Sequence, residues 1–299
     1  MRQFIKNDRP IWQTNTNMVQ VNCYNCGSRE SHFYAYENGF TLVKCSSCGL
    51  LYVTPRPSER EINEAHQTGL HQGETQLHTS GTFNKTKAKS YLKILEDLFQ
   101  QELKKGKYVW LDIGCGNGEF ISALQEFSEG HIIAKGLEPN RRKQKTARAR
   151  GLDVSWFDLG GYNHFYDYVS LLNVYSHLAN PIDFLMQYKR MLKRGGKFLI
   201  QTGDTANLCA EMHPRPFFLP DHLSFASEEI VSSILKRSGF EIIAIRKYPA
   251  YSFGAVRIAK ELVKLLWPGK KSELSCLPGQ FKLSRKLRTD MYILASVPA

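Results

Sequence analysis

From residue 83 onward, hydrophobic positions fall into two alternating patterns. Apolar residues first recur at helical spacing until Gly106, at Tyr91, Leu92, Leu95, Leu98 and Phe99, which predicts a helix. Short apolar runs then predict strands at 108–113, 132–137, 153–157, 167–173, 196–201, 240–247 and 289–297, with amphipathic helices between most of them. This order predicts an α/β fold, namely a doubly wound, mostly parallel sheet of seven strands.

Two intervals depart from the alternation. Residues 54–82 are polar and broken by Pro55 and Pro57, which predicts a linker or lid. An insertion at 254–285 begins with an amphipathic pattern over 254–267, which is typical of a helix that packs on the protein body or on a second copy. Contact with a membrane surface or docking of the substrate is the alternative. Because no apolar run reaches about eighteen residues and the first residues lack a signal-peptide core, we expect a cytoplasmic protein without a transmembrane segment.

Four of the seven cysteines form two close pairs near the N-terminus. Cys23 and Cys26 are followed by Gly27, and Cys45 and Cys48 by Gly49. Cys-x-x-Cys pairs with a hairpin-like segment between them are typical of a zinc ribbon, in which four thiolates hold one structural zinc ion. We therefore expect a zinc-ribbon module at 1–53, a linker or lid at 54–82 and a catalytic domain at 83–299.

The stretch "VWLDIGCGNGEF" at 109–120 predicts a ligand-binding turn after the first strand of the sheet. Its third glycine, Gly118, comes one residue too early for the dinucleotide fingerprint, and no lysine follows it as a phosphate-binding loop would require. Asp112 would repel a pyrophosphate but attract an amine or a sulfonium. The turn therefore favours a cationic ligand over NAD or ATP.

Charge is distributed unevenly along the chain, which has a formal net charge of +12. Residues 1–80 hold seven Lys or Arg and seven Asp or Glu, so the excess falls in the remainder, most densely in "RRKQKTARAR" at 141–150. A basic surface of this kind is compatible with nucleic acid or other phosphorylated partners without selecting one.

Four ordered motifs resemble those of the class I S-adenosylmethionine-dependent methyltransferases: "LDIGCGNGEF", "GLEPN", "YDYVSLLNVYSHLANP" and "MLKRGGKFLI". The segment "VKCSSCGLLYVTPRPSE" is similar to the N-terminal zinc-binding module of a bacterial subset of that family. Members of the subset often act on sugars or on intermediates of glycan and natural-product pathways. The resemblance implies methyl transfer from S-adenosylmethionine to such an acceptor, with oxygen as the expected acceptor atom.

The resemblance also assigns cofactor contacts to residues at the carboxyl ends of the strands. Glu138 would accept both ribose hydroxyls, Asp158 with the Leu159 backbone would receive the adenine amine, and Asn173 would line the cofactor. The methionine end would lie on the loop formed by Asp112, Gly114, Cys115, Gly116 and Gly118.

Two histidines lie where the family places active-site groups, His177 in "NVYSHL" and His222 in "LPDHLSF". Either could take a proton from a hydroxyl acceptor, since imidazole titrates near neutral pH. Two other functions stay open: an RNA methyltransferase that uses the zinc ribbon and the basic surface, and a cofactor-binding protein without catalysis.

Overall fold

The computed structural model describes residues 18–71, 75–76, 82–156, 165–249, 251–252 and 286–299. These residues form two compact units that share the chain between them. The first contains residues up to 57, 203–231 and 247–291, and the second contains 58–202, 232–246 and 292–299. The insertion predicted at 254–285, with its helix at 254–267, lies outside the described residues, and so do Asp158 and Leu159.

The main sheet has seven strands in the order β10-β9-β8-β11-β12-β17-β14. The strands span Tyr108–Ile113 (β8), Ile132–Leu137 (β9), Val154–Ser155 (β10), Tyr166–Leu172 (β11), Leu192–Gly203 (β12), Glu241–Tyr248 (β14) and Asp290–Ser296 (β17). The five strands from β10 to β12 are parallel, so their carboxyl ends meet at one edge. The expected doubly wound fold is confirmed.

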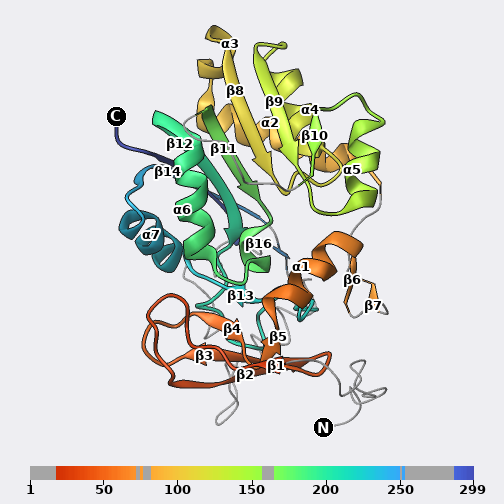
Figure 1. The fold of residues 1–299 in the computed structure, drawn as a ribbon. Coiled ribbons are helices and arrows are strands. Elements are labelled where there is room, and N and C mark those ends of the chain that lie inside the picture. Colours follow the sequence, from red (N-terminus) through yellow and green to blue (C-terminus); the bar gives the residue numbers. More distant parts are fainter. Residues whose placement is uncertain (1–17, 72–74, 77–81, 157–164, 250, 253–285) are drawn as a thin grey trace. The chain divides into compact units, whose positions relative to one another are not determined.

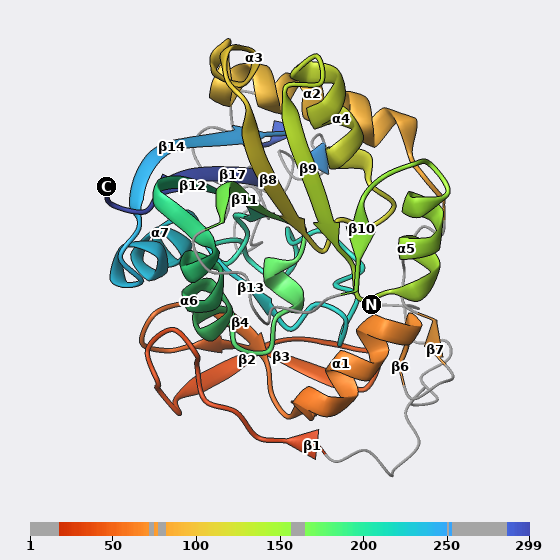
Figure 2. The ribbon, with the colours of Figure 1, turned by 45° about the horizontal axis from the view of Figure 1, so that its top comes forward.

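Helices follow the strands as the hydrophobic spacing predicts. They are α2 (Lys85–Phe99), α3 (Glu102–Lys105), α4 (Glu119–Phe127), α5 (Arg141–Arg148), α6 (Pro181–Met191) and α7 (Glu228–Arg237). Figures 1 and 2 show α2 and α4 on one face of the sheet and α6 on the other. Fully buried side chains such as Trp110, Leu95 and Phe198 form the core on these faces.

The segment expected to be a linker contains a regular helix, α1 (Glu59–Thr68). Ser58 and Glu61 form a capping box at its start, and Gly69 ends it in a left-handed conformation. Only Ile62 and Ala65 are buried, so the hydrophobic signal was weak. The capping sequence Ser-x-x-Glu was the available indication.

The first unit contains an antiparallel sheet in the order β13-β4-β3-β2. Its strands are β2 (Ser31–Glu37), β3 (Phe40–Cys45), β4 (Leu51–Val53) and β13 (Ser224–Phe225), while β1 (Met18–Val19) pairs with β5 (Arg56–Pro57). The expected hairpin is β2–β3, and it turns through Asn38 and Gly39, both with positive φ. β13 comes from a part of the chain that we expected inside the catalytic domain.

Two short strand pairs and one 3₁₀ turn complete the elements of the described residues. β6 (Leu70–His71) pairs with β7 (Thr75–Gln76), and β15 (Tyr251–Ser252) pairs with β16 (Lys286–Leu287). A 3₁₀ turn, η1 (Tyr175–His177), follows β11. Within the described residues, no helix is long and apolar enough to cross a membrane.

Candidate functional site

The glycine turn lies between β8 and α4, at the carboxyl edge of the sheet. Gly114, Gly116 and Gly118 all have φ between 61° and 85°, a region that costs glycine nothing. The backbone N–H groups of Gly114 and Cys115 donate to the carbonyl of Leu137, at 2.7 and 3.1 Å, which holds the turn against the end of β9. A Cβ on Gly116 would meet only the Glu119 carboxylate within 4 Å, so the middle of the turn is open to a ligand.

Asp112, the last acid before this turn, is almost completely buried, with 2% of its surface exposed. Its Oδ1 accepts a hydrogen bond from the Ser170 hydroxyl at 2.6 Å. Burial raises the pKa of the Asp112 carboxyl to about 7, although Ser170 and Lys87 oppose the shift. A carboxylate in this position favours a cationic ligand, because such a ligand would offset the charge that burial penalises.

Glu138 follows β9 and is 4% exposed. Its Oε2 accepts the Gly116 N–H at 2.7 Å and its Oε1 accepts the Asn140 N–H at 2.8 Å. Burial raises the pKa of Glu138, while Lys143 and these two N–H groups act in the opposite direction. Because each carboxylate oxygen has two lone pairs, both oxygens keep the capacity to accept a ribose hydroxyl.

Asn173 and Cys115, two other predicted cofactor contacts, differ in their exposure. Asn173 follows β11, is exposed, and has a φ of 59°, which asparagine tolerates better than most residues. The Cys115 thiol is buried and points at Gly136, where a Cβ would lie 2.5 Å from its Sγ. Only the backbone of Cys115 can therefore face a ligand.

His177 ends η1 after β11, and its backbone N–H donates to the Val174 carbonyl at 2.9 Å. Its ring is perpendicular to that of His66, with the centroids 6.1 Å apart. Both residues belong to the second unit. His66 comes from α1, so the sequence analysis, which assigned that segment to a linker, missed this neighbour.

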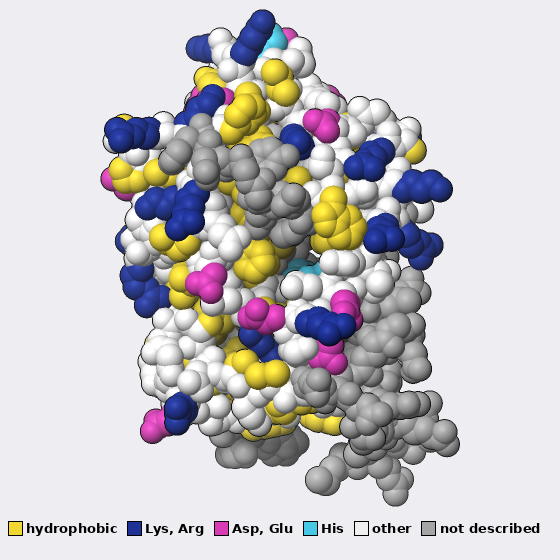
Figure 3. Space-filling view, viewed as in Figure 1, with side chains coloured by type: hydrophobic (Ala, Val, Ile, Leu, Met, Phe, Trp, Pro, Cys, Tyr) yellow, Lys and Arg dark blue, Asp and Glu magenta, His cyan; other side chains and the backbone are white. Residues whose placement is uncertain are grey.

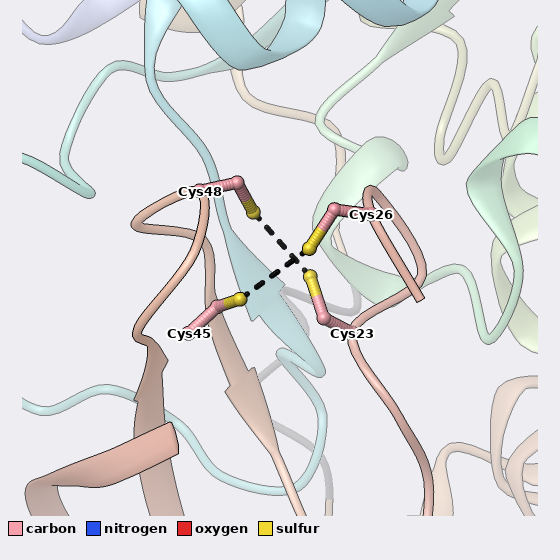
Figure 4. A group of neighbouring side chains, drawn as sticks. All are labelled: Cys23, Cys26, Cys45 and Cys48. Carbon is pink, nitrogen blue, oxygen red and sulfur yellow. Dashed lines mark hydrogen bonds between the residues drawn. The ribbon is translucent and has the colours of Figure 1, made fainter. Parts of the chain in front are cut away.

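Figure 4 shows the four paired cysteines converging from two loops of the first unit. The Sγ atoms of Cys23 and Cys48, and those of Cys26 and Cys45, are 3.5 Å apart, and all four sulfurs lie within 4.8 Å of one another. A disulfide requires about 2.05 Å, whereas tetrahedral zinc at about 2.3 Å from each sulfur separates the sulfurs by about 3.8 Å. The cluster therefore has the dimensions of a metal site.

The two cysteine loops have the same backbone arrangement. Gly27 donates to the Cys23 carbonyl at 2.7 Å and Gly49 to the Cys45 carbonyl at 3.0 Å, and both glycines have positive φ. Burial raises the pKa of Cys45, but the N–H groups of Cys48 and Ser47 outweigh it and bring the pKa to about 7. Backbone donors therefore favour the thiolate of Cys45, the form that binds metal, whereas burial raises the pKa of Cys23 and of Cys26 despite similar donors.

His222 belongs to the first unit, in the loop before β13. Its Nδ1 lies 2.9 Å from the Phe217 carbonyl oxygen. Since a carbonyl only accepts, Nδ1 carries the proton, and Nε2 of the neutral ring holds the lone pair. The loop itself is held by Glu37 at the end of β2, whose carboxylate accepts the N–H groups of Phe217 and Leu219 at 2.8 and 3.1 Å.

Comparison with known proteins identifies the family. Residues 83–245, more than half of the chain, match the family described as the methyltransferase domain. The chain belongs to this methyltransferase family. Two solved structures share the fold at a TM-score of 0.50: a methyltransferase of Bacillus halodurans, 17% identical and covering 70% of this chain and 100% of that one, and an S-adenosylmethionine-dependent methyltransferase of Archaeoglobus fulgidus, 18% identical and covering 70% and 94%.

Curated relatives of the methyltransferase match a smaller share of the chain than these two structures do. An uncharacterized protein of Methanocaldococcus jannaschii is 27% identical over 49% of this chain and 70% of its own length. The tRNA U34 carboxymethyltransferase of Colwellia psychrerythraea is 30% identical over 47% of this chain and 46% of its own length. The chain thus spans less than half of that tRNA-modifying relative.

The turn geometry fits the cofactor of the family. The buried Asp112 carboxylate suits a cation, the open backbone at Gly116 allows close approach, and Glu138 keeps acceptor capacity for hydroxyls. The methyltransferase also has an acid that the sequence analysis left without a role: Glu119, 5% exposed, accepts the Asn84 N–H at the start of α2 at 3.0 Å. Its place directly after Gly118 was the available signal.

Proposed function

We propose that this S-adenosylmethionine-dependent methyltransferase methylates a hydroxyl of a small-molecule or glycosylated acceptor, such as a sugar or a glycan or natural-product intermediate. His222 is the first candidate for the general base and His177 the second. The observation that carries the proposal is the bond from His222 Nδ1 to the Phe217 carbonyl. It leaves Nε2 as the basic nitrogen, which is what proton removal from an acceptor hydroxyl requires.

The cofactor, when bound, supplies a sulfonium methyl group for in-line displacement. Asp112 would face the ammonium of its methionine end, and Glu138 would accept the ribose hydroxyls. Asn173, and Asp158 with Leu159 beyond the described residues, complete the proposed cofactor contacts. His222 would take the acceptor proton onto Nε2, so that the oxygen attacks as an alkoxide-like nucleophile.

Substitution of His222 by alanine should lower turnover by roughly a hundredfold or more, the usual size of a lost general base, and leave cofactor affinity nearly unchanged. The measurement is transfer of labelled methyl from S-adenosylmethionine to a panel of nucleotide sugars and free glycosides. His222→Gln separates proton removal from hydrogen bonding, because its amide can still position a substrate. Full turnover in His222→Ala would pass the role to His177, whose alanine variant is measured in parallel.

We also propose that Cys23, Cys26, Cys45 and Cys48 hold one structural zinc ion. Four cysteine sulfurs at these distances could all bind one ion as thiolates, and such a closed tetrahedral site would leave no open position for a substrate. The zinc would therefore stabilise the fold of the first unit and take no part in catalysis.

RNA methylation is the second candidate function, and α5 is the observation that favours it. Five cationic side chains lie on this eight-residue helix (Arg141, Arg142, Lys143, Lys145 and Arg148), and Figure 3 shows basic side chains gathered there. The Arg141 guanidinium also lies over the ring of the partly exposed Trp156, 5.5 Å from its centroid. Exposed cations beside an aromatic ring are common in surfaces that bind single-stranded nucleic acid.

Binding of bulk tRNA, followed by fluorescence anisotropy across salt concentrations, distinguishes the two functions. An RNA acceptor predicts tight, salt-sensitive binding that weakens in an Arg141→Ala/Arg142→Ala variant, with the salt slope reduced by about one for each phosphate contact removed. A small acceptor predicts weak retention that these substitutions leave unchanged. A Lys236→Ala/Arg237→Ala variant on α7 controls for loss of charge elsewhere.

A further inference from the structure

Three buried side chains connect strands β8 and β11 beneath the glycine turn. The Trp110 indole Nε1 donates to the Ser170 Oγ at 2.9 Å, and the Ser170 hydroxyl donates to Asp112 Oδ1 at 2.6 Å. An indole N–H can only donate, and the single proton of the Ser170 hydroxyl points to Asp112 when the carboxylate is ionised, since an ionised carboxylate can only accept. Trp110, Ser170 and Asp112 thus form a one-way chain of donors that ends on a carboxylate.

The strand register produces this chain. Ser170 is paired with Asp112, and Tyr168 with Trp110, in the parallel β8–β11 pairing. Residues two apart on a strand share one face, so Trp110 and Asp112 project to the same side as their neighbour Ser170. All three side chains are at most 2% exposed, and water cannot replace either bond without a rearrangement of the core.

The surroundings of Asp112 make its orientation consequential. Its carboxyl is destabilised as an anion by burial and by the acids Glu138 and Glu119, and stabilised by Ser170 and by Lys87 of α2, which together leave a pKa of about 7. Its Oδ2 accepts no hydrogen bond from the part of the chain that the structure describes. One oxygen is therefore fixed by the donor chain while the other is left for a ligand.

We infer that Ser170 and Trp110 are positioning residues for the cofactor: their donor chain holds Oδ1 of Asp112 so that Oδ2 faces the ammonium group at the methionine end of S-adenosylmethionine. This inference rests on the proposed role of Asp112 in cofactor binding, and it does not depend on the identity of the acceptor. It also couples binding to protonation. The cation needs the ionised carboxylate, so binding expels the proton that the ligand-free protein holds on Asp112.

The sign of the pH dependence follows from this coupling. Below a pH of about 7 the ligand-free carboxyl is mostly neutral, so the cofactor must displace a proton and binds more weakly. Affinity should rise as the pH increases through 7 and level off above it. Near pH 7 wild-type protein should release a fraction of a proton on binding, because a group close to its pKa is partly protonated.

Isothermal titration calorimetry with S-adenosylmethionine and S-adenosylhomocysteine, in two buffers of different ionisation enthalpy, tests the inference. Ser170→Ala removes the bond to Oδ1, which should weaken both ligands by about tenfold or more, as expected for a hydrogen bond to a charged group. Because the anion loses a donor, proton release at pH 7 should also rise toward one. Trp110→Phe leaves Ser170 in place but removes the indole N–H that donates to it. This variant should shift ligand affinity and proton release in the same directions as Ser170→Ala, by smaller amounts.

Ser128→Ala is the matched control. Ser128 is equally buried, at the far end of α4, and its hydroxyl has no hydrogen-bond partner among the described residues, so its removal should leave affinity and proton release unchanged.

Asp112→Asn tests the premise, the role of Asp112 in cofactor binding, separately from the positioning role of Ser170. If Asp112→Asn binds the cofactor normally, Asp112 has no part in the site; if Asp112→Asn loses affinity and Ser170→Ala keeps wild-type affinity and proton release, the positioning role is wrong. If Ser170→Ala lost affinity for S-adenosylmethionine and kept its affinity for S-adenosylhomocysteine, the assignment of the ammonium group as the partner of Asp112 would be wrong, because both ligands carry that group.

Discussion

Removal of the zinc ion that we propose for the four-cysteine cluster should unfold the first unit and leave cofactor binding intact. Cys23 and Cys26 lie in the loop before β2, Cys45 ends β3 and Cys48 follows it. Cys23 and Cys45 are buried. In small zinc modules the binding free energy of the metal, about 10–16 kcal/mol, is available to folding. The proposed cofactor contacts belong to the second unit, whose sheet has its own core, so they should survive.

The consequences of metal loss should extend to His222. β13 pairs with β4, and the Glu37 carboxylate at the end of β2 holds the 217–219 loop that accepts the His222 Nδ1 proton. When the cysteine loops lose their metal, this support is lost with them. We therefore expect turnover to fall with metal content while the affinity for S-adenosylmethionine stays within a small factor of wild type.

The measurement combines metal analysis, hydrogen exchange and calorimetry on the full chain. Wild-type protein purified without chelators should contain about one equivalent of zinc, and a Cys45→Ser/Cys48→Ser variant should contain almost none. Exchange should accelerate in β2, β3, β4 and β13 and stay slow in β8 and β11. A Cys209→Ser variant, which changes a thiol outside the cluster, is the control; slow exchange in β2–β4 after complete chelation would show that the metal does not hold the unit together.

The main sheet could be predicted from the sequence because its signals are local. Each strand from β8 to β12 is a short apolar run, and the glycine turn has a sequence that few other structures require. Predicted and observed strand boundaries differ by a few residues, as for β12, which begins at Leu192 where the pattern suggested 196. Pattern analysis finds the centre of an element more easily than its ends.

Contacts between distant parts of the chain could not be predicted in this way. β13 pairs with β4 although more than 170 residues separate them in the sequence, and Glu37 binds the 217–219 loop across a similar sequence separation. No spacing within a short window records such pairings. The hydrogen bonds of Ser170 and Trp110 could not be predicted either, because in the sequence both are ordinary strand residues. Only the register of β8 against β11 shows that they form a chain of hydrogen bonds to Asp112.

The candidate cofactor contacts came from two kinds of signal in the sequence. Asp112 stood out because it precedes the glycine turn, whereas Glu138 and Asn173 were assigned by the family resemblance, at the carboxyl ends of parallel strands, which meet at one edge of the sheet. His66, the neighbour of His177, was not named, because its helix buries only two side chains and has a polar surface. A capped helix in a polar segment leaves a short sequence signature, and that signature is easily overlooked when the search is for hydrophobic periodicity.

Glu138→Ala should weaken S-adenosylmethionine binding by roughly a hundredfold to ten-thousandfold, since two hydrogen bonds to a charged group of about 1.5–3 kcal/mol each are removed. The structure adds a second reason. Glu138 also accepts hydrogen bonds from the N–H groups of Gly116 and Asn140, so its loss leaves both donors without their acceptor and loosens the glycine turn, where we propose that the methionine end binds. Glu138→Gln keeps one acceptor oxygen and should fall between wild type and Glu138→Ala.

A cycle that changes the ligand as well as the protein separates these two causes. Wild-type protein should bind S-adenosylhomocysteine much more tightly than its 2′,3′-dideoxy analogue, because the analogue lacks the hydroxyls that we propose as donors to Glu138. If the direct contact dominates, Glu138→Ala should bind the two ligands equally, and the coupling energy of the cycle should account for most of its loss. If the variant still prefers the natural ribose by the wild-type factor, Glu138 serves only to hold the turn, and the ribose contact must be sought elsewhere on the carboxyl edge of the sheet.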